Sequence, residues 1–318
     1  MGKGGKKTSL KTALSTQQSR LKQKAVLAAR AAEKSKKAKS RNKAVPPHYT
    51  IPFKPTDQIL LIGEGNFSFV HALALNPPPS LEFLPAPNIT ATAYDSEQEC
   101  YAKYPDAAKI VHSLREKDVE VIFSVDATKL ESHPGLKGRR WDKIVWNFPH
   151  AGRGITDQDR NILSNQTLIL EFLRSAANLL VTGPVPAIHY SRKGKQKADA
   201  ENDELDGNDP GEDMLADELI DESTKVRGSI LITLRNVAPY TLWDLPNLAK
   251  KPPPPKSTQD KLYPRYMQLR SFAFQRSVWK GYGHRMTKGE RAHGQGKTGE
   301  GGEDRTWEFC LQGLMSET

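Results

Sequence analysis

The sequence predicts an α/β fold built on a doubly wound, mainly parallel sheet of seven strands. Three observations lead to this prediction. Five short apolar runs rich in β-branched residues are spaced along the chain, stretches with helical periodicity separate them, and two alternating segments near the carboxyl end form a candidate antiparallel edge pair. Strands that alternate with helices form βαβ units, and these units produce parallel strands.

The runs expected to form the parallel strands are residues 59–62, 89–94, 119–123, 143–146 and 229–234. The first run, Ile-Leu-Leu-Ile, is apolar without interruption, which is typical of a strand buried on both faces. Residues 266–275 and 306–312 alternate instead, and they are expected to form the antiparallel pair at one edge of the sheet.

Helices are expected at residues 66–75, at residues 96–103 with a continuation after Pro105 to residue 117, and at residues 156–181. The third pattern is the clearest, because Leu163, Leu170 and Leu173 recur on one face and Ala177 and Leu180 continue it. The Gly-Pro pair that follows at residues 183–184 is a typical stop signal.

Charge is distributed unevenly along the chain. The whole sequence has 47 Lys+Arg and 37 Asp+Glu, a net charge of +10, yet residues 1–46 alone carry 14 Lys+Arg and one acid. This basic tail is predicted to be disordered in isolation and to serve nuclear or nucleolar targeting and RNA contact, with a simple solubility role as the alternative. A run at residues 199–222 carries 12 acids and no base, so residues 191–228 are interpreted as an acidic surface insertion.

Several classes of protein are disfavoured. No window approaches eighteen apolar residues and no apolar segment follows the basic amino end, so neither a membrane span nor a secretory signal is expected, and the protein is predicted to be intracellular. The two cysteines, Cys100 and Cys310, are far apart, which argues against a disulfide framework and a cysteine-rich zinc site. The basic remainder of the chain fits a polyanionic partner.

The first predicted strand runs into the sequence Gly63-Glu64-Gly65-Asn66-Phe67-Ser68, and Asp95 ends the second strand. Glycines there allow a tight turn and a close approach of the backbone to a ligand, and an acid in that place suits a ribose. Ser68 replaces the third glycine of the dinucleotide fingerprint and no Walker loop is present, so S-adenosylmethionine fits best, with Asp126 as the adenine contact. The alternatives are an ordinary βα turn and, for Asp126, a helix N-cap.

The fourth predicted strand ends in Asn147-Phe148-Pro149-His150. A polar side chain, an aromatic ring and a proline beside the cofactor loop suit a flat base held for methyl transfer. Asn147 is a candidate donor to a base carbonyl, and His150 is a candidate proton acceptor. The alternative for both side chains is capping of the turn.

These motifs together resemble the eukaryotic large-subunit ribosomal RNA uridine-N3 methyltransferases, a family of class I, Rossmann-like methyltransferases that use S-adenosylmethionine. The resemblance rests on the Gly-Glu-Gly-Asn-Phe-Ser-Phe run, on Ala-Tyr-Asp-Ser at residues 93–96, on residues 141–150, and on Gly-Tyr-Gly-His-Arg at residues 281–285. It covers residues 58–180 and resumes at 229. After the fifth strand this chain has Arg235 and then Pro239-Tyr240, and it lacks the rest of the Lys-x-Gly-x-Pro-Tyr pattern of relatives.

The resemblance implies methyl transfer to N3 of a uridine in large-subunit ribosomal RNA by a methyltransferase domain at residues 47–318. The residues expected to act in catalysis are Asn147, Phe148, Pro149 and His150, and those expected to bind the cofactor are Gly63, Glu64, Gly65, Asn66, Phe67, Ser68, Asp95 and Asp126. No metal is expected, because no His, Cys and carboxylate cluster has ligand spacing. The expected partner is ribosomal RNA within a pre-ribosome, in the nucleolus. The alternatives are an inactive RNA-binding assembly factor and a methyltransferase for another RNA or atom.

Overall fold

The computed structural model describes residues 49–186, 226–254, 262–286 and 302–313, and tertiary contacts group the chain from Tyr49 onward into one unit. The predicted basic tail and almost all of the predicted acidic insertion lie outside the described residues.

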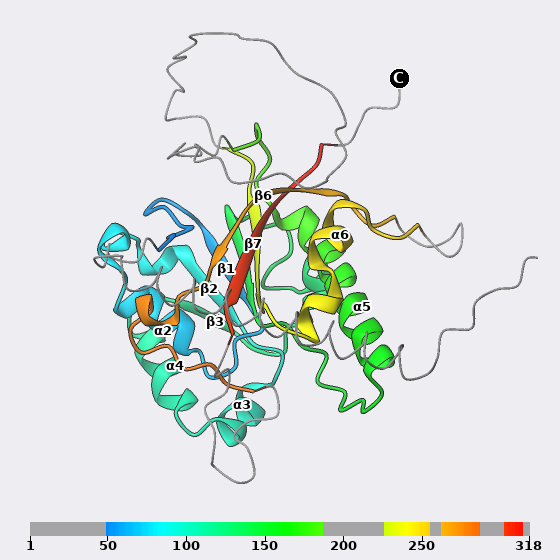
Figure 1. Ribbon diagram of the computed structural model, residues 1–318. Coiled ribbons are helices and arrows are strands. Elements are labelled where there is room, and N and C mark those ends of the chain that lie inside the picture. Colours follow the sequence, from blue (N-terminus) through cyan, green and yellow to red (C-terminus); the bar gives the residue numbers. More distant parts are fainter. Residues whose placement is uncertain (1–48, 187–225, 255–261, 287–301, 314–318) are drawn as a thin grey trace, which may run out of the picture. The chain divides into compact units, whose positions relative to one another are not determined.

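A seven-stranded sheet forms the centre of this unit, as predicted (Figure 1). The strands are β1 (Ile59–Ile62), β2 (Ile89–Thr92), β3 (Glu120–Ile122), β4 (Lys143–Asn147), β5 (Ser229–Arg235), β6 (Tyr266–Ala273) and β7 (Asp304–Leu311). Their order is β3-β2-β1-β4-β5-β7-β6. The first five strands are parallel, and β7 pairs antiparallel with both β5 and β6. The order reverses between β1 and β4, which is where open α/β sheets bind ligands.

The α-helices are α2 (Ser68–Leu75), α3 (Glu97–Lys103), α4 (Ala107–Arg115), α5 (Gln158–Ala176) and α6 (Leu245–Lys250). Short 3-10 turns are η1 (Pro79–Leu81), η2 (Ala86–Asn88), η3 (Ala127–Ser132), η4 (Ala177–Leu179), η5 (Tyr240–Trp243) and η6 (Arg276–Val278). Helices α2 and α4 cover one face of the sheet, and α5 and α6 cover the other (Figure 1). No helix among the described residues is long and apolar enough to cross a membrane.

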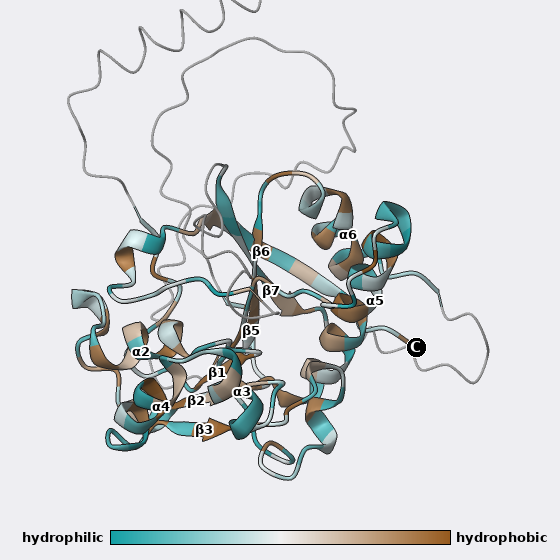
Figure 2. Cartoon of the chain, turned by 90° about the horizontal axis from the view of Figure 1, so that it is seen from below, coloured by the Kyte–Doolittle hydropathy of each residue, from teal (hydrophilic) through white to brown (hydrophobic). Residues whose placement is uncertain are grey.

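The two faces of the sheet explain the uninterrupted apolar sequence of β1. Its side chains alternate between two cores: Leu60 packs with the α5 side, and Leu61 packs with the α2 and α4 side. Both side chains are fully buried, and Figure 2 shows the central strands as hydrophobic and the outer turns of the helices as hydrophilic. Both faces of such a strand are covered by helices, so every side chain is buried. The alternation of apolar and polar residues that is typical of a strand with one exposed face is therefore absent.

Helix α5 differs from the prediction at both ends. It begins at Gln158, where the Asp157 side chain accepts a hydrogen bond of 2.8 Å from the backbone N–H of Arg160, and it changes to 3-10 geometry at Ala177. Leu163 was expected on the buried face, but its exposed fraction is 62%. Leu163 lies in the first half of α5, which forms one wall of a cleft, so its side chain borders that cleft instead of the core.

The end of the predicted acidic insertion also differs from the expectation. Arg227 and Gly228, assigned to the insertion, join the described fold directly before β5. Arg227 donates to the carbonyl oxygens of Gly183 and Leu311 at 3.0 and 2.6 Å. A Cβ at Gly228 would lie 2.6 Å from the carbonyl oxygen of Trp141, so only glycine permits this close approach of two backbones.

Candidate active site

A cleft of about 1040 Å³ opens at the carboxyl ends of β1 to β4, and the first half of α5 forms its other wall. The predicted site residues that line it are Gly63, Asp95, Asp126, Phe148, Pro149 and His150. The other predicted residues of the loop after β1, and Asn147, do not line it. The cleft lies at the switch point of the sheet, and its size is typical of a pocket for a small molecule or cofactor.

Gly63 brings bare backbone to the cleft. Its φ angle is +63°, and a Cβ there would lie 2.9 Å from Nε1 of Trp146 on β4. The next N–H group, that of Glu64, donates to the carbonyl oxygen of Thr92 at the end of β2 at 2.8 Å. The turn is therefore fixed next to β2 and β4. Any residue other than glycine at position 63 would have a strained backbone and a Cβ that clashes with Trp146.

Glu64 turns away from the cleft toward the first turn of α2. Its carboxylate accepts hydrogen bonds from the backbone N–H groups of Phe69 and Val70, which otherwise lack partners at a helix start. The N-cap residue of α2, Phe67, offers no capping side chain, so Glu64 replaces it in that role. Loss of solvent around the carboxyl group raises its pKa to about 7, although the two N–H groups oppose this shift.

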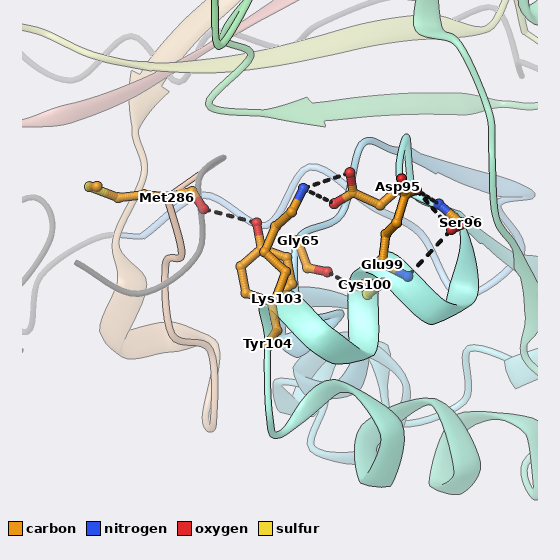
Figure 3. Close-up of polar contacts among 8 residues, drawn as sticks. All are labelled: Gly65, Asp95, Ser96, Glu99, Cys100, Lys103, Tyr104 and Met286. Atoms are coloured by element: carbon orange, nitrogen blue, oxygen red, sulfur yellow. Dashed lines mark hydrogen bonds and ion pairs between the residues drawn. The ribbon is translucent and has the colours of Figure 1, made fainter. Parts of the chain in front are cut away.

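The remaining residues of the loop hold neighbouring segments in place. Asn66 donates from Nδ2 to Oδ2 of Asp106 at 2.8 Å, and the Ser68 hydroxyl donates to the carbonyl oxygen of Gly283 at 3.0 Å. Gly65 accepts a hydrogen bond from the thiol of Cys100 at 3.4 Å (Figure 3), and Phe67 is fully buried. These residues hold the loop and its neighbours in place without lining the cleft.

Asp95 follows the carboxyl end of β2 and lines the cleft. Its two carboxylate oxygens accept hydrogen bonds from Nζ of Lys103 on α3 at 2.7 and 2.6 Å. Ser96 starts α3 with a reciprocal capping box to Glu99, which fixes the helix that carries Lys103. A ligand hydroxyl that binds Asp95 would meet a carboxylate already held in place by a cation.

Asp126 adopts the N-cap geometry that was the alternative interpretation. Its Oδ1 accepts hydrogen bonds from the backbone N–H and the hydroxyl of Thr128 at 2.9 and 2.7 Å. The residue also lines the cleft. The two hydrogen bonds with Thr128 hold the Asp126 side chain at the wall of the cleft, between the end of β3 and the start of η3.

Asn147 ends β4 with its side chain toward a different cavity from the cleft. Its Oδ1 accepts a hydrogen bond from the Thr233 hydroxyl at 2.8 Å, and that hydroxyl also bonds Thr306 at 2.9 Å. Nδ2 of Asn147 is buried and has no partner among the described residues. The side chain borders a small cavity of about 20 Å³ on the α2 side of the sheet. Its visible role is to join β4 to β5.

Phe148 makes the turn that brings Pro149 and His150 into the cleft. Its φ angle is +54°, and its N–H donates to the carbonyl oxygen of Thr233 at 2.8 Å. The Phe148 ring packs 4.4 Å from the ring of His284, and the Arg276 guanidinium lies 5.2 Å from its centre. The conformation is uncommon for an aromatic residue, and such strain persists only where the surroundings enforce it.

His150 is exposed at the mouth of the cleft. Its Nδ1 accepts a hydrogen bond from the backbone N–H of Gly152 at 2.9 Å, so the neutral ring carries its proton on Nε2. Asn165, buried on α5, accepts a hydrogen bond of 2.8 Å from the N–H of Ala151 and holds this segment against the helix. With this tautomer the ring acts as a hydrogen-bond donor at Nε2.

Sequence reasoning missed several residues that shape the site. Lys103 and Asn165 belong to helices, and Trp146 was assigned only to a strand. Asn165 had a usable signal, because a lone amide on the apolar face of a helix needs buried partners. Lys103 had no such signal, since a lysine near the end of a helix is ordinary.

The Gly-Tyr-Gly-His-Arg segment returns to the start of α2. The N–H of Gly283 donates to the Ser68 hydroxyl at 3.1 Å, and Arg285 forms an ion pair of 2.9 Å with Asp106. Tyr104 donates from its hydroxyl to the carbonyl oxygen of Met286 at 2.9 Å (Figure 3). Among the described residues, no group of three or more His, Cys, Asp or Glu is placed to hold a metal ion.

Comparison with known families decides the assignment. The family model described as "rRNA (uridine-N3-)-methyltransferase BTM5-like" matches residues 60–286, which is most of the chain. The chain belongs to this BMT5-like family. The resemblance found in the motifs of the sequence is thereby confirmed.

Curated relatives are similar to this chain over different shares of its length. The 25S rRNA (uridine(2634)-N(3))-methyltransferase of Saccharomyces cerevisiae is 30% identical over 267 residues, which cover 76% of this chain and 69% of the yeast enzyme. The heavy metal-associated isoprenylated plant protein 41 of Arabidopsis thaliana is 35% identical over 45% of this chain and 26% of its own length. The human ferredoxin-fold anticodon-binding domain-containing protein 1 is 35% identical over 39% of this chain and 18% of its own length.

Proposed function

We propose that this member of the BMT5-like family transfers the methyl group of S-adenosylmethionine to N3 of a uridine in large-subunit ribosomal RNA. The observation that supports it most is the cleft at the switch point of the sheet, which Gly63 and Asp95 both line in a chain of this family. We further propose that the substrate is a pre-ribosomal particle and that the protein acts in the nucleolus.

The cleft fits the cofactor on structural grounds. A side chain at position 63 would fill the space beside Trp146, so bare backbone is available for the amino-acid part of the cofactor. Asp95 offers carboxylate oxygens for the ribose hydroxyls, and Asp126 with Val125 gives a polar and an apolar contact for the adenine. When bound, S-adenosylmethionine supplies a methyl group on a positively charged sulfur, ready for attack by a nucleophile.

The protein's own residues position the nucleophile. N3 of uridine carries a proton at neutral pH, and the ring becomes nucleophilic as that proton leaves to solvent or another base. His150 donates a hydrogen bond from Nε2 to a uracil carbonyl and stabilises the negative charge that develops there. Phe148 and Pro149 form the rigid wall of the cleft that leads to His150 and so set the position of that histidine beside the reacting edge of the base. Asn147 acts as a positioning residue, because its buried amide holds β4 to β5.

Asp95→Asn tests the cofactor site. The substitution keeps the shape but removes the charge that a ribose hydroxyl would bind, so we expect the affinity for S-adenosylhomocysteine in calorimetry to fall about tenfold to a hundredfold. Glu82→Ala is the matched control, since Glu82 is an exposed acid outside the cleft. Unchanged affinity in a folded Asp95→Asn protein would overturn the site assignment.

Methylation of ribosomal RNA tests the reaction itself. Ribosomal RNA from cells that lack the protein is expected to lose one 3-methyluridine in nucleoside mass spectrometry, and the purified protein is expected to restore it. A protein that binds S-adenosylhomocysteine and ribosomal RNA but restores no methyl group would be an assembly factor without catalysis. A different methylated nucleoside would keep the enzyme class and change the substrate.

A further inference from the structure

A second cavity adjoins the cleft where η5 meets the first turn of α5. It measures about 470 Å³ and shares His150 and Ile155 with the cleft. The rest of its wall includes Gln158 of α5 and the Pro239-Tyr240 pair that follows β5. The two cavities therefore meet at the residue that we place at the reacting base.

The wall of this second cavity is aromatic. Tyr240 and Trp243 pack with ring centres 5.1 Å apart at 61°, and the His150 ring lies 6.0 Å from that of Trp243. Trp243 is 1% exposed, and its indole N–H has no hydrogen-bond partner among the described residues. A buried donor without a partner is costly in a merely structural position, and aromatic rings of this kind stack on nucleic-acid bases.

Polar side chains line the second cavity, and cationic side chains border the cleft next to it. The side chains of Gln158 and Tyr240 form no hydrogen bond within the described parts of the chain, and both residues are at least partly exposed. Arg153 and Arg160 border the adjoining cleft, are exposed, and form no ion pair with any described residue. Cations without carboxylate partners beside an aromatic cavity suit a nucleotide whose base enters the cavity while its phosphates stay outside.

We propose that this second cavity holds the target nucleotide, with its uracil stacked on Tyr240 and its imide edge at the wall shared with the cleft. The inference rests on the proposed function and names where its substrate binds. The carboxylates of the cleft, Asp95 and Asp126, favour the cofactor over an RNA phosphate on that side. The carboxylates of the cleft and the aromatic wall of the second cavity therefore assign the cofactor to the first and the base to the second.

Photo-crosslinking locates the base directly. The full chain is mixed with S-adenosylhomocysteine and a short single-stranded RNA that carries one 5-iodouridine among adenosines, and binding is measured before irradiation. We expect the adduct in the tryptic peptide of residues 236–250, which contains Tyr240 and Trp243. An adduct confined to other segments, or an RNA that does not bind, overturns the proposal.

Variants give a second, independent measurement. Tyr240→Ala is expected to weaken binding of the same RNA about tenfold, while Tyr240→Phe keeps the ring and binds nearly as the wild type does. Gln158→Ala, at an exposed position, should weaken binding less and leave the fold intact. Leu242→Ala is the control, because Leu242 belongs to the same short helix, is 49% exposed and does not line the cavity.

The outcomes separate the two proposals. S-adenosylhomocysteine affinity is expected to be unchanged in all these variants, because the cofactor lies in the other cavity. If Tyr240→Ala binds RNA as tightly as the wild type while ribosomal RNA is methylated normally, the cavity assignment fails and the proposed function stands. If the adduct lies at residues 236–250 but no methyl group is transferred, the base pocket stands and the proposed function fails.

Discussion

Two titratable side chains near the cleft have pKa values displaced in opposite directions. Loss of solvent raises the pKa of Glu64 to about 7. Loss of solvent, together with the nearby charges of Arg276 and Arg235, lowers the pKa of His284 to about 4. Both shifts favour the neutral form of a buried group, and they give the folded state opposite dependences on pH.

The pH dependence of stability follows from these shifts. His284 has a folded pKa below its unfolded value of 6.5, so its contribution decreases as pH falls from about 6.5 to 4. Glu64 has a folded pKa above its unfolded value of 4.5, so its contribution is lost as pH rises from about 4.5 through 7. In thermal melts, the stability of Glu64→Gln relative to the wild type is therefore expected to increase as pH rises from 5 to 8. The stability of His284→Gln relative to the wild type is expected to decrease as pH rises from 4.5 to 7, because only the wild type gains from the neutral histidine. Parallel curves for a variant and the wild type would contradict the assignment for that residue.

His150 provides a test of its tautomer. Because Nδ1 already accepts the N–H of Gly152, the neutral ring has its proton on Nε2 and donates at that atom. We expect His150→Gln to slow single-turnover methylation and to keep the pH profile of the wild type, since glutamine also offers an N–H. If an ionisation present in the wild type disappears in His150→Gln, the histidine is the proton acceptor instead.

At the scale of elements, the start of α2 organises one side of the site. Glu64 caps the helix, Ser68 bonds Gly283, and Asn66 shares the Asp106 carboxylate with Arg285. Residues more than 200 positions apart in the chain thus meet at one helix end. The segment at 281–286 is fixed by these contacts and in turn packs His284 on Phe148.

Asp106→Ala tests this arrangement. The substitution removes the common acceptor of Asn66 and Arg285, and we expect the unfolding free energy to fall by about 1–3 kcal/mol. Backbone amides of residues 281–286 should exchange hydrogen faster than in the wild type. Glu116→Ala serves as control, because Glu116 makes only an exposed contact of 3.3 Å with His112. Equal exchange in both variants would show that the segment is held by other contacts.

At the scale of the whole molecule, the basic residues at 1–46 lie outside the described structure. What we expect of them is therefore argued from their charge alone. This stretch carries 14 Lys+Arg against one acid. Cations that neutralise RNA phosphates release counterions, and the affinity they add falls steeply with salt concentration.

Deletion of residues 1–46 is therefore expected to weaken binding to ribosomal RNA and to flatten the dependence of the affinity on salt. The affinity for S-adenosylhomocysteine should stay the same, because the cleft belongs to the unit that begins at Tyr49. Filter binding across a series of salt concentrations measures the RNA affinity, and calorimetry measures the affinity for S-adenosylhomocysteine. Identical RNA affinity and salt slope in both proteins would leave the tail with a targeting or solubility role alone.

Local sequence was enough to predict the sheet. Unbroken apolar runs such as residues 59–62 arise because both faces of a central strand are buried, and that requirement is visible without a structure. The seven strands and their antiparallel edge pair were predicted correctly. Gly63 and Asp95 were placed at the cleft for the same reason, since the ends of parallel strands meet at one edge of the sheet.

Only the tertiary structure decided which side chains of the predicted motifs line the cleft. Glu64 turns to a helix start and Asn147 turns to Thr233, because a strand end alternates its faces and a helix start needs acceptors for its N–H groups. Lys103 reaches Asp95 through the packing of α3 against β2. The second cavity depends on η5 and α5, whose contact unites residues about 85 positions apart, and no local pattern specifies such a contact.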